Sequence, residues 1–210
     1  MEDSSLIVGL GNPGKEYADT RHNIGFMILE RLAKYLNFSW QLNKKFTAEL
    51  AKGNIDGRNI LLTKPQCYMN LSGKTVFLLA GYYKIHTKQI MVVMDDLDLP
   101  LGTLRMRPNG GNGGHRGIES ISDCLGTSDF PRLRIGIGRP NLKHDISDFV
   151  LGKFDEKEMG QLENVLETAS NQLNCWINEG LQTAMNNYNG DLTPNNEEKK
   201  DDEIRRNNNS

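Results

Sequence analysis

The stretch that decides the fold is SLIVGLGNPG at residues 5–14, a short apolar run that ends in glycines and a proline. Such a run is typical of a buried strand followed by a turn. Farther along, from Ile24 to Leu36, apolar side chains recur every three or four residues, which is the spacing of a helix. The order strand, loop, helix predicts the first unit of an α/β domain.

The rest of the chain alternates strands and helices, with one hairpin between them. The hairpin joins residues 46–51 to residues 59–63 through an Asp56-Gly57 turn. Further strands are predicted at residues 90–94, 103–107 and 133–137, and further helices at residues 71–83, 118–125 and 155–176. We therefore expect a single three-layer α/β domain over residues 1–190, in which helices flank a mixed, mostly parallel twisted sheet. Residues 191–210 are almost entirely polar, and we expect them to form a disordered tail.

The net charge of −2 over 210 residues excludes a bulk polycation that binds nucleic acid through its total charge, but the charge is polarised along the chain. Residues 102–144 hold seven basic and three acidic side chains, whereas residues 145–190 hold eight acids and two lysines. The spacing of Arg105 with Arg107 and of Arg132 with Arg134 puts each pair on one face of a strand. This region is therefore a candidate phosphate-binding surface, and the alternative is that the arginines only solvate strand faces.

Several classes of protein and site are disfavoured. No apolar run reaches the roughly 18 residues of a membrane span, and the opening Met1-Glu2-Asp3 is acidic where a signal peptide is basic, so we expect a cytoplasmic protein. The three cysteines are odd in number and far apart, which argues against disulfides and a cysteine zinc site. The four histidines show no metal-ligand spacing, so we expect no metal site.

Two glycine patterns imitate nucleotide sites. GLGNPG at residues 9–14 fits the dinucleotide pattern, but the next helix starts about ten residues too late. SGKT at residues 72–75 lacks the first glycine of a phosphate-binding P-loop. A third stretch, NGGNGGHRG at residues 109–117, could approach an anion closely, act as a flexible lid or simply join two elements.

A histidine and a carboxylate are the candidate chemical groups. His22 lies in the polar loop after the first strand, and Asp95 ends a predicted strand, at the edge where α/β sheets place their sites. Imidazole ordinarily titrates near neutral pH, and a carboxylate can hold one ring nitrogen and so set the tautomer. A purely structural pair is the alternative.

Five blocks resemble bacterial-type peptidyl-tRNA hydrolase. The first comprises LIVGLGNPG at residues 6–14, Tyr17 and TRHNIG at residues 20–25. The others are Lys64-Pro65 with YMNLSG at residues 68–73, DDLDLP at residues 95–100, GGH at residues 113–115 and LRIGIGRP at residues 133–140. The resemblance spans roughly residues 6–190 in the same order and spacing.

This resemblance implies a single α/β domain that hydrolyses the ester between a peptide and the 3′ end of tRNA without metal or cofactor. It implies His22 as general base and Asp95 as the acid that orients it, acting on a bound water. Substrate binding is expected of Asn12, Tyr17, Met69, Asn70, Asn112, His115 and Arg116. Phosphates of the tRNA acceptor stem are expected to meet Arg105, Arg107 and Arg134, and we expect the enzyme to act as a monomer.

Arg116 departs from the family pattern, which commonly has asparagine after Gly-Gly-His. Because a guanidinium carries only donors and a permanent charge, we expect Arg116 to point toward the 3′-terminal nucleotides, while Asn112 or a water covers the lost amide. A solvent-facing arginine without a role is the alternative. Two further hypotheses stay open: a catalytically silent RNA-binding relative, and a nucleotide-dependent oxidoreductase that rests on the glycine pattern alone.

Overall fold

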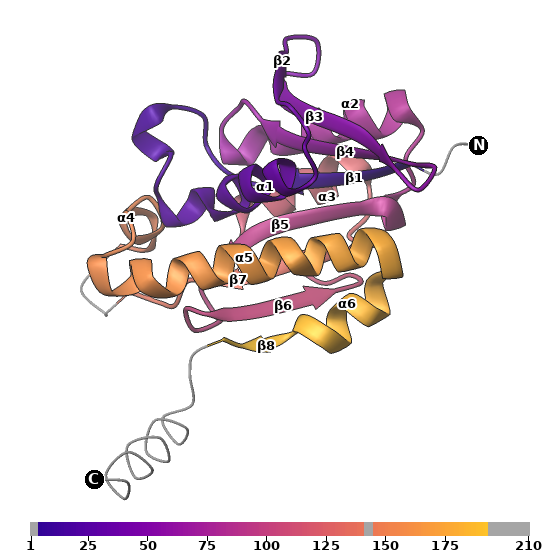
Figure 1. Ribbon diagram of the computed structural model, residues 1–210. Coiled ribbons are helices and arrows are strands. Elements are labelled where there is room, and N and C mark those ends of the chain that lie inside the picture. Colours follow the sequence, from indigo (N-terminus) through magenta and orange to yellow (C-terminus); the bar gives the residue numbers. More distant parts are fainter. Residues whose placement is uncertain (1–3, 141–144, 193–210) are drawn as a thin grey trace, which may run out of the picture.

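An eight-stranded mixed sheet runs through the molecule, with helices on both faces (Figure 1). The structure is a computed structural model and describes residues 4–140 and 145–192. The strands are β1 (Ser4–Gly9), β2 (Gln41–Asn43), β3 (Ala48–Ile55), β4 (Arg58–Pro65), β5 (Ile90–Asp96), β6 (Thr103–Arg107), β7 (Arg132–Gly136) and β8 (Gly190–Asp191). Their order in the sheet is β2-β3-β4-β1-β5-β7-β6-β8.

The parallel part of the sheet is its centre. Strands β4, β1, β5 and β7 pair in parallel, whereas β2, β3, β6 and β8 join the margins in antiparallel pairs. The mixed sheet predicted from the sequence is therefore confirmed, but among the described strands three pairings are parallel and four are antiparallel, so parallel pairing is confined to the centre and does not dominate the sheet. The expected hairpin is β3 and β4, joined through Asp56-Gly57.

Every predicted helix is present, and some short elements were not predicted. The helices are α1 (Ile24–Tyr35), α2 (Ser72–Tyr83), α3 (Arg116–Leu125), α4 (Ile146–Val150), α5 (Glu156–Glu179) and α6 (Leu181–Tyr188), with 3-10 turns η1 (Lys15–Tyr17), η2 (Arg21–Asn23), η3 (Met69–Leu71) and η4 (Thr87–Gln89). Strands β2 and β8 and helices α4 and α6 are too short for a clear periodic pattern. Among the described residues no helix is both long and apolar enough to cross a membrane.

Each face of the sheet carries its own apolar core. In β1, Ile7 packs toward α1 and α5, while its neighbours Leu6 and Val8 pack toward α2 and α3. Strand β5 alternates in the same way, with Met91 and Val93 in the first core. A strand buried on both faces reads as a continuous apolar run, which is why these two strands were recognisable from the sequence.

One close approach places the start of α1 against the sheet. A Cβ on Gly25 would lie 2.6 Å from the backbone nitrogen of Leu10 and 2.6 Å from the carbonyl oxygen of Val93. Only glycine therefore allows α1 to begin at the carboxyl ends of β1 and β5. The consequence is that η2, which carries His22, lies beside Asp95 at the end of β5.

The SGKT stretch serves helix packing. A Cβ on Gly73 would lie 1.9 Å from the carbonyl oxygen of Ser120, so α2 and α3 meet at this residue. The amide of Gly73 donates to the Ser120 hydroxyl at 3.0 Å. The glycine is thus explained by the contact between two helices.

The domain extends past the expected start of the tail at Asp191. Asp191 pairs with Thr103 in the sheet, and the amide of Leu192 donates to the carbonyl of Gly102 at 2.9 Å. The side chain of Asn189 bonds both the amide and the carbonyl of Met106, as a neighbouring strand would. The boundary is therefore corrected by two residues, because edge pairing needs backbone groups and not apolar side chains. Residues 193–210 lie outside the described part of the chain.

Candidate active site

A cavity of about 850 Å³ lies at the carboxyl ends of the central strands. Its walls come from the loop after β1, from η3, from the glycine-rich loop before α3 and from α4. The cavity brings together nearly all residues predicted for the site: Asn12, Tyr17, His22, Met69, Asn70, Asp95, Arg107, Asn112, His115, Arg116 and Arg134. Arg105 does not line the cavity.

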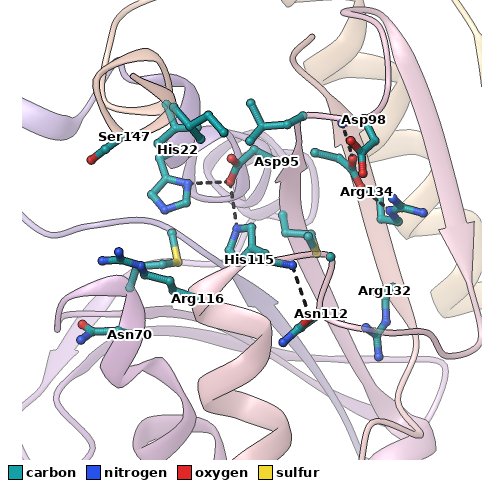
Figure 2. A pocket seen from close by; sticks show the side chains of 18 of the residues that line it. His22, Asn70, Asp95, Asp98, Asn112, His115, Arg116, Arg132, Arg134 and Ser147 are labelled. Atoms are coloured by element: carbon teal, nitrogen blue, oxygen red, sulfur yellow. Dashed lines mark hydrogen bonds and ion pairs between the residues drawn. The ribbon is translucent and has the colours of Figure 1, made fainter. Parts of the chain in front are cut away.

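Two histidines share one carboxylate oxygen at the centre of the cavity. His22 Nδ1 lies 2.9 Å from Asp95 Oδ1, and His115 Nε2 lies 3.1 Å from the same oxygen (Figure 2). The two rings are 5.1 Å apart between centroids. Asp95 is only 3% exposed, so the oxygen is held by imidazoles and not by bulk water.

The hydrogen bonds show which ring nitrogens of His22 and His115 carry a proton. His115 Nδ1 accepts the amides of Gly117 at 3.1 Å and Ile118 at 3.4 Å, as the N-cap of α3. Its proton is therefore on Nε2, which donates to Asp95. Because the Asp95 carboxylate accepts, His22 carries its proton on Nδ1, and the His22 Nε2 keeps a lone pair on the side away from Asp95.

Asp95 is held in its charged form. Burial by itself would raise the pKa of this carboxyl, but its electrostatic interactions and hydrogen bonds with His22 and His115 outweigh burial and hold the pKa well below its usual range. A carboxylate at neutral pH can stabilise positive charge on His22. The pair is thus arranged for proton transfer.

The same three side chains could hold a metal ion by spacing, since one ligand atom of each lies within 4.8 Å of the others. A metal on His115 Nε2 would have to displace its proton, and that proton would then belong on Nδ1, which caps α3. The observed hydrogen bonds fit a proton-transfer centre better than a metal centre.

Asn12 presents an amide donor to the cavity. Its Oδ1 accepts the amide of Met69 at 2.8 Å, and its backbone is bonded at both the amide and the carbonyl by the side chain of Asn23. Among the described residues Asn12 Nδ2 has no hydrogen-bond partner, so this group is left to face the cavity. Asn23 was not predicted as a site residue, although it follows His22 directly in the sequence.

The glycine-rich loop is held at two points. The Oδ1 of Asn112 accepts the amide of Gly114 at 3.3 Å, so Asn112 keeps its two amide hydrogens and one lone pair for a substrate. Arg132 donates to the carbonyl of Gly111 at 2.9 Å from outside the loop. Arg116 is exposed, forms no ion pair within the described residues, and in Figure 2 is directed to the side of the cavity where Asn70 lies.

His115 is placed differently from the sequence prediction of a substrate-binding side chain. It lines the cavity, but its ring nitrogens are taken by Asp95 and by the cap of α3. No hydrogen-bonding position of the ring remains for a substrate. The sequence signal that could have shown this is the position of His115 directly before a helix.

Four arginines share one face of the sheet: the spacing predicted one face for each pair, and the strand register brings the two pairs together. Arg105 lies opposite Arg134, and Arg107 lies opposite Arg132, in the antiparallel register of β6 and β7. Arg132 is 2% exposed and stacks on the Phe130 ring at 4.5 Å, and burial lowers its pKa. Arg132 is therefore a structural residue that fastens the glycine-rich loop.

The remaining arginines differ in how far they are neutralised. Arg134 forms an ion pair with the buried Asp96, and Arg139 pairs with Asp98, whose pKa it lowers. Arg105 and Arg107 form no ion pair within residues 4–140 and 145–192. These two are the stronger candidates for binding phosphate.

Sequence reasoning missed the wall formed by α4. Ile146, Ser147 and Leu151 line the cavity, and Figure 2 shows Ser147 on the His22 side. Arg21 holds this wall by donating to the carbonyl of Lys153 at 2.7 Å and to Glu158 at 2.6 Å. No short motif signals α4, because it is a single turn fixed by tertiary contacts.

The fold and the site together define a class: a single-domain α/β protein with an imidazole–carboxylate centre in a cavity lined by amides and arginines. The sequence model of the family described as peptidyl-tRNA hydrolase matches residues 6–200. The chain belongs to the peptidyl-tRNA hydrolase family.

Individual relatives agree along most of the chain. A peptidyl-tRNA hydrolase of Desulforamulus reducens is 48% identical over 184 residues, covering 88% of this chain and 88% of that protein. One of Chloroflexus aurantiacus is 48% identical over 185 residues, covering 88% of this chain and 98% of that protein. A crystal structure of peptidyl-tRNA hydrolase from Acinetobacter baumannii superposes with a TM-score of 0.85 at 38% identity, covering 91% of this chain and 97% of that chain.

Proposed function

We propose that this protein hydrolyses the ester bond between peptide and tRNA in peptidyl-tRNA, and so frees tRNA for reuse. The observation that carries the proposal is the His22 ring, which Asp95 holds by Nδ1 so that Nε2 is free to accept a proton. Family membership supports the substrate class. The products are a peptide with a free carboxyl group and a tRNA with a free terminal hydroxyl.

In the proposed reaction, His22 Nε2 takes a proton from a water molecule as that water attacks the ester carbonyl. Asp95 stabilises the imidazolium that forms. When the carbon–oxygen bond to the ribose breaks, the imidazolium returns the proton to the leaving oxygen. Each turnover therefore consumes one water and leaves His22 neutral.

The asparagine side chains of the cavity are suited to bind the tetrahedral intermediate and the peptide main chain. Asn12 Nδ2, left free by the bond of Oδ1 to Met69, can donate to the oxygen that becomes negative in the tetrahedral intermediate. Asn70 and Asn112 offer neutral donors to the peptide main chain, and Tyr17 and Met69 contribute a ring and a thioether to the walls. Such contacts use only what all peptides share, so they tolerate any peptide sequence.

The arginines are proposed to hold the nucleic acid. Arg105 and Arg107 carry unpaired charge for phosphates of the acceptor stem, with Arg134 beside them partly neutralised by Asp96. Phosphate contacts give affinity without reading bases, as an enzyme that serves every tRNA requires. Arg116 is proposed to reach the 3′-terminal nucleotides from the cavity rim.

One chain supplies every residue named above, so the proposal needs no second subunit, and a monomer suffices. The substrate is a product of translation, and we propose that the reaction takes place in the cytoplasm. Neither a metal nor another cofactor enters the proposed steps.

The test is to incubate the protein with N-blocked aminoacyl-tRNA and measure release of the blocked amino acid. The wild type is expected to release it, and His22→Ala to lose about 10²–10⁴-fold in kcat while still binding tRNA. Retention of more than about a tenth of the wild-type kcat in His22→Ala would refute the role of His22. A wild type that binds tRNA and releases nothing would instead indicate a silent RNA-binding relative.

A further inference from the structure

His115 is the buried titratable group that the proposed reaction does not use. Its side chain is 7% exposed, and it bonds Asp95 through Nε2 and the first amides of α3 through Nδ1. A substrate-binding histidine would keep one nitrogen free. His115 instead links the end of a helix to the carboxylate that holds His22.

We propose that His115 is a positioning residue: the cap of α3 fixes its ring as an Nε2–H donor, and this donor sets how strongly Asp95 can hold His22. The proposal rests on the proposed function of His22 and Asp95. It assigns to His115 a role other than substrate binding.

The helix cap provides the lock on the tautomer. Two amide hydrogens point at His115 Nδ1, at 3.1 Å from Gly117 and 3.4 Å from Ile118. A proton on Nδ1 would face these hydrogens and the positive end of the helix dipole. The Nε2–H form is therefore the one that satisfies α3, and it always presents a donor to Asp95.

Because His115 and His22 bond the same oxygen, His115 influences how strongly Asp95 holds His22. Asp95 Oδ1 accepts from His22 at 2.9 Å and from His115 at 3.1 Å, so the negative charge of the carboxylate is divided between the two donors. A hydrogen bond donated to a carboxylate stabilises its negative charge and so weakens its pull on a second donor. His115 thereby limits how far Asp95 favours the imidazolium of His22.

Other charged groups around His22 are not part of this link. Arg21 precedes His22 but is bonded to Glu158 of α5. Asp145 before α4 and Arg116 at the start of α3 line the same cavity, and neither has a hydrogen bond to His22 or Asp95 within the described residues. All four stay unchanged in the variants below.

The variant His115→Asn separates the two contacts of the ring. Asparagine is a strong N-cap, so α3 keeps its cap, but its side chain is too short to reach Asp95. We expect the melting temperature to stay near that of the wild type and the acidic limb of the rate–pH profile to move up by about 0.5–1 pH unit, the worth of one hydrogen bond. His115→Ala should give the same movement with a lower melting temperature, because the cap is lost too.

The matched control is His86→Asn, which changes an exposed histidine before η4 that makes no side-chain cap. It should leave both the profile and the melting temperature unchanged. An unmoved acidic limb in His115→Asn would overturn the proposal. An unmoved acidic limb together with a several-fold rise in KM would indicate that His115 binds substrate.

A second measurement does not depend on activity. Spectra of ¹⁵N-histidine-labelled wild type at pH 7 should show His115 protonated on Nε2 alone, and the His22 resonance should titrate at higher pH in His115→Asn. An Nδ1 proton on His115, or an unmoved His22 titration, would overturn the proposal. If the wild type releases no blocked amino acid, the proposed function fails, and these spectra still decide the role of His115.

Discussion

Replacement of Asp95 by asparagine isolates the charge behind His22. The two side chains have the same shape, and an asparagine Oδ1 in the same place could still accept from both His22 and His115. What is lost is the negative charge. Asp95→Asn therefore tests electrostatics with little change in packing.

The size of the effect follows from the geometry. The His22 nitrogen and the Asp95 oxygen are 2.9 Å apart, which places the centres of the two delocalised charges about 4 Å apart. At an effective dielectric constant of about 20, a pair at that distance is worth about 4 kcal/mol. Because the imidazolium exists only as the reaction proceeds, the loss falls on kcat and amounts to about 10³-fold.

The assay is single-turnover release of an N-blocked amino acid from its tRNA, with tRNA binding measured separately. The matched control is Asp96→Asn, because Asp96 is also buried but pairs with Arg134 and not with His22. The control should keep kcat within a few-fold. A loss of less than tenfold in Asp95→Asn, or equal losses in the two variants, would refute the charge argument.

Other expectations concern the arginines and acid stability. Arg105→Ala and Arg107→Ala should each lower the slope of log affinity against log salt for tRNA by up to about 0.9, and blocked aminoacyl-adenosine should be unaffected as a substrate; equal losses on both substrates would place these arginines in the chemistry. Arg116→Asn should weaken tRNA binding more at low than at high salt, with kcat within a few-fold, whereas unchanged binding at every salt concentration would leave Arg116 without a role. Since the pKa of Asp95 is lower in the folded than in the unfolded protein, its stabilisation is fully present above about pH 4 and declines as the pH falls from there toward the folded pKa, so the difference in free energy of unfolding between the wild type and Asp95→Asn should be smaller at pH 3 than at pH 7. If the difference in free energy of unfolding between the two proteins were the same at pH 7 and pH 3, the lowered pKa of Asp95 would be contradicted.

Much of the site could be predicted because its residues follow the ends of recognisable strands. Asn12 comes after β1 and Asp95 ends β5, and both strands read as apolar runs since both of their faces are buried. Parallel strands bring their carboxyl ends to one edge of the sheet, so residues far apart in sequence had to meet there. His22 joins them because Gly25 lets α1 begin against that edge.

The roles of individual charged side chains could not be predicted. Arg132 and Arg134 have the same spacing in the sequence as Arg105 and Arg107, yet one holds a loop carbonyl and the other an aspartate. A side chain's charge is available to a ligand only if no buried partner takes it first. The partners of Arg132 and Arg134 lie 21 and 38 positions away in the sequence.

The sequence by itself determined the α/β fold, the family, and the residues gathered at the carboxyl edge, because these depend on local periodicity and on motifs of adjacent residues. Only the tertiary structure decided that His115 caps α3 and shares Asp95 with His22, that α4 closes one wall of the cavity, and that Asp191 and Leu192 belong to the sheet. The cap is local, but the shared oxygen, the wall and the edge pairing all depend on contacts between segments that are distant in the sequence, and no pattern along the chain records such a contact.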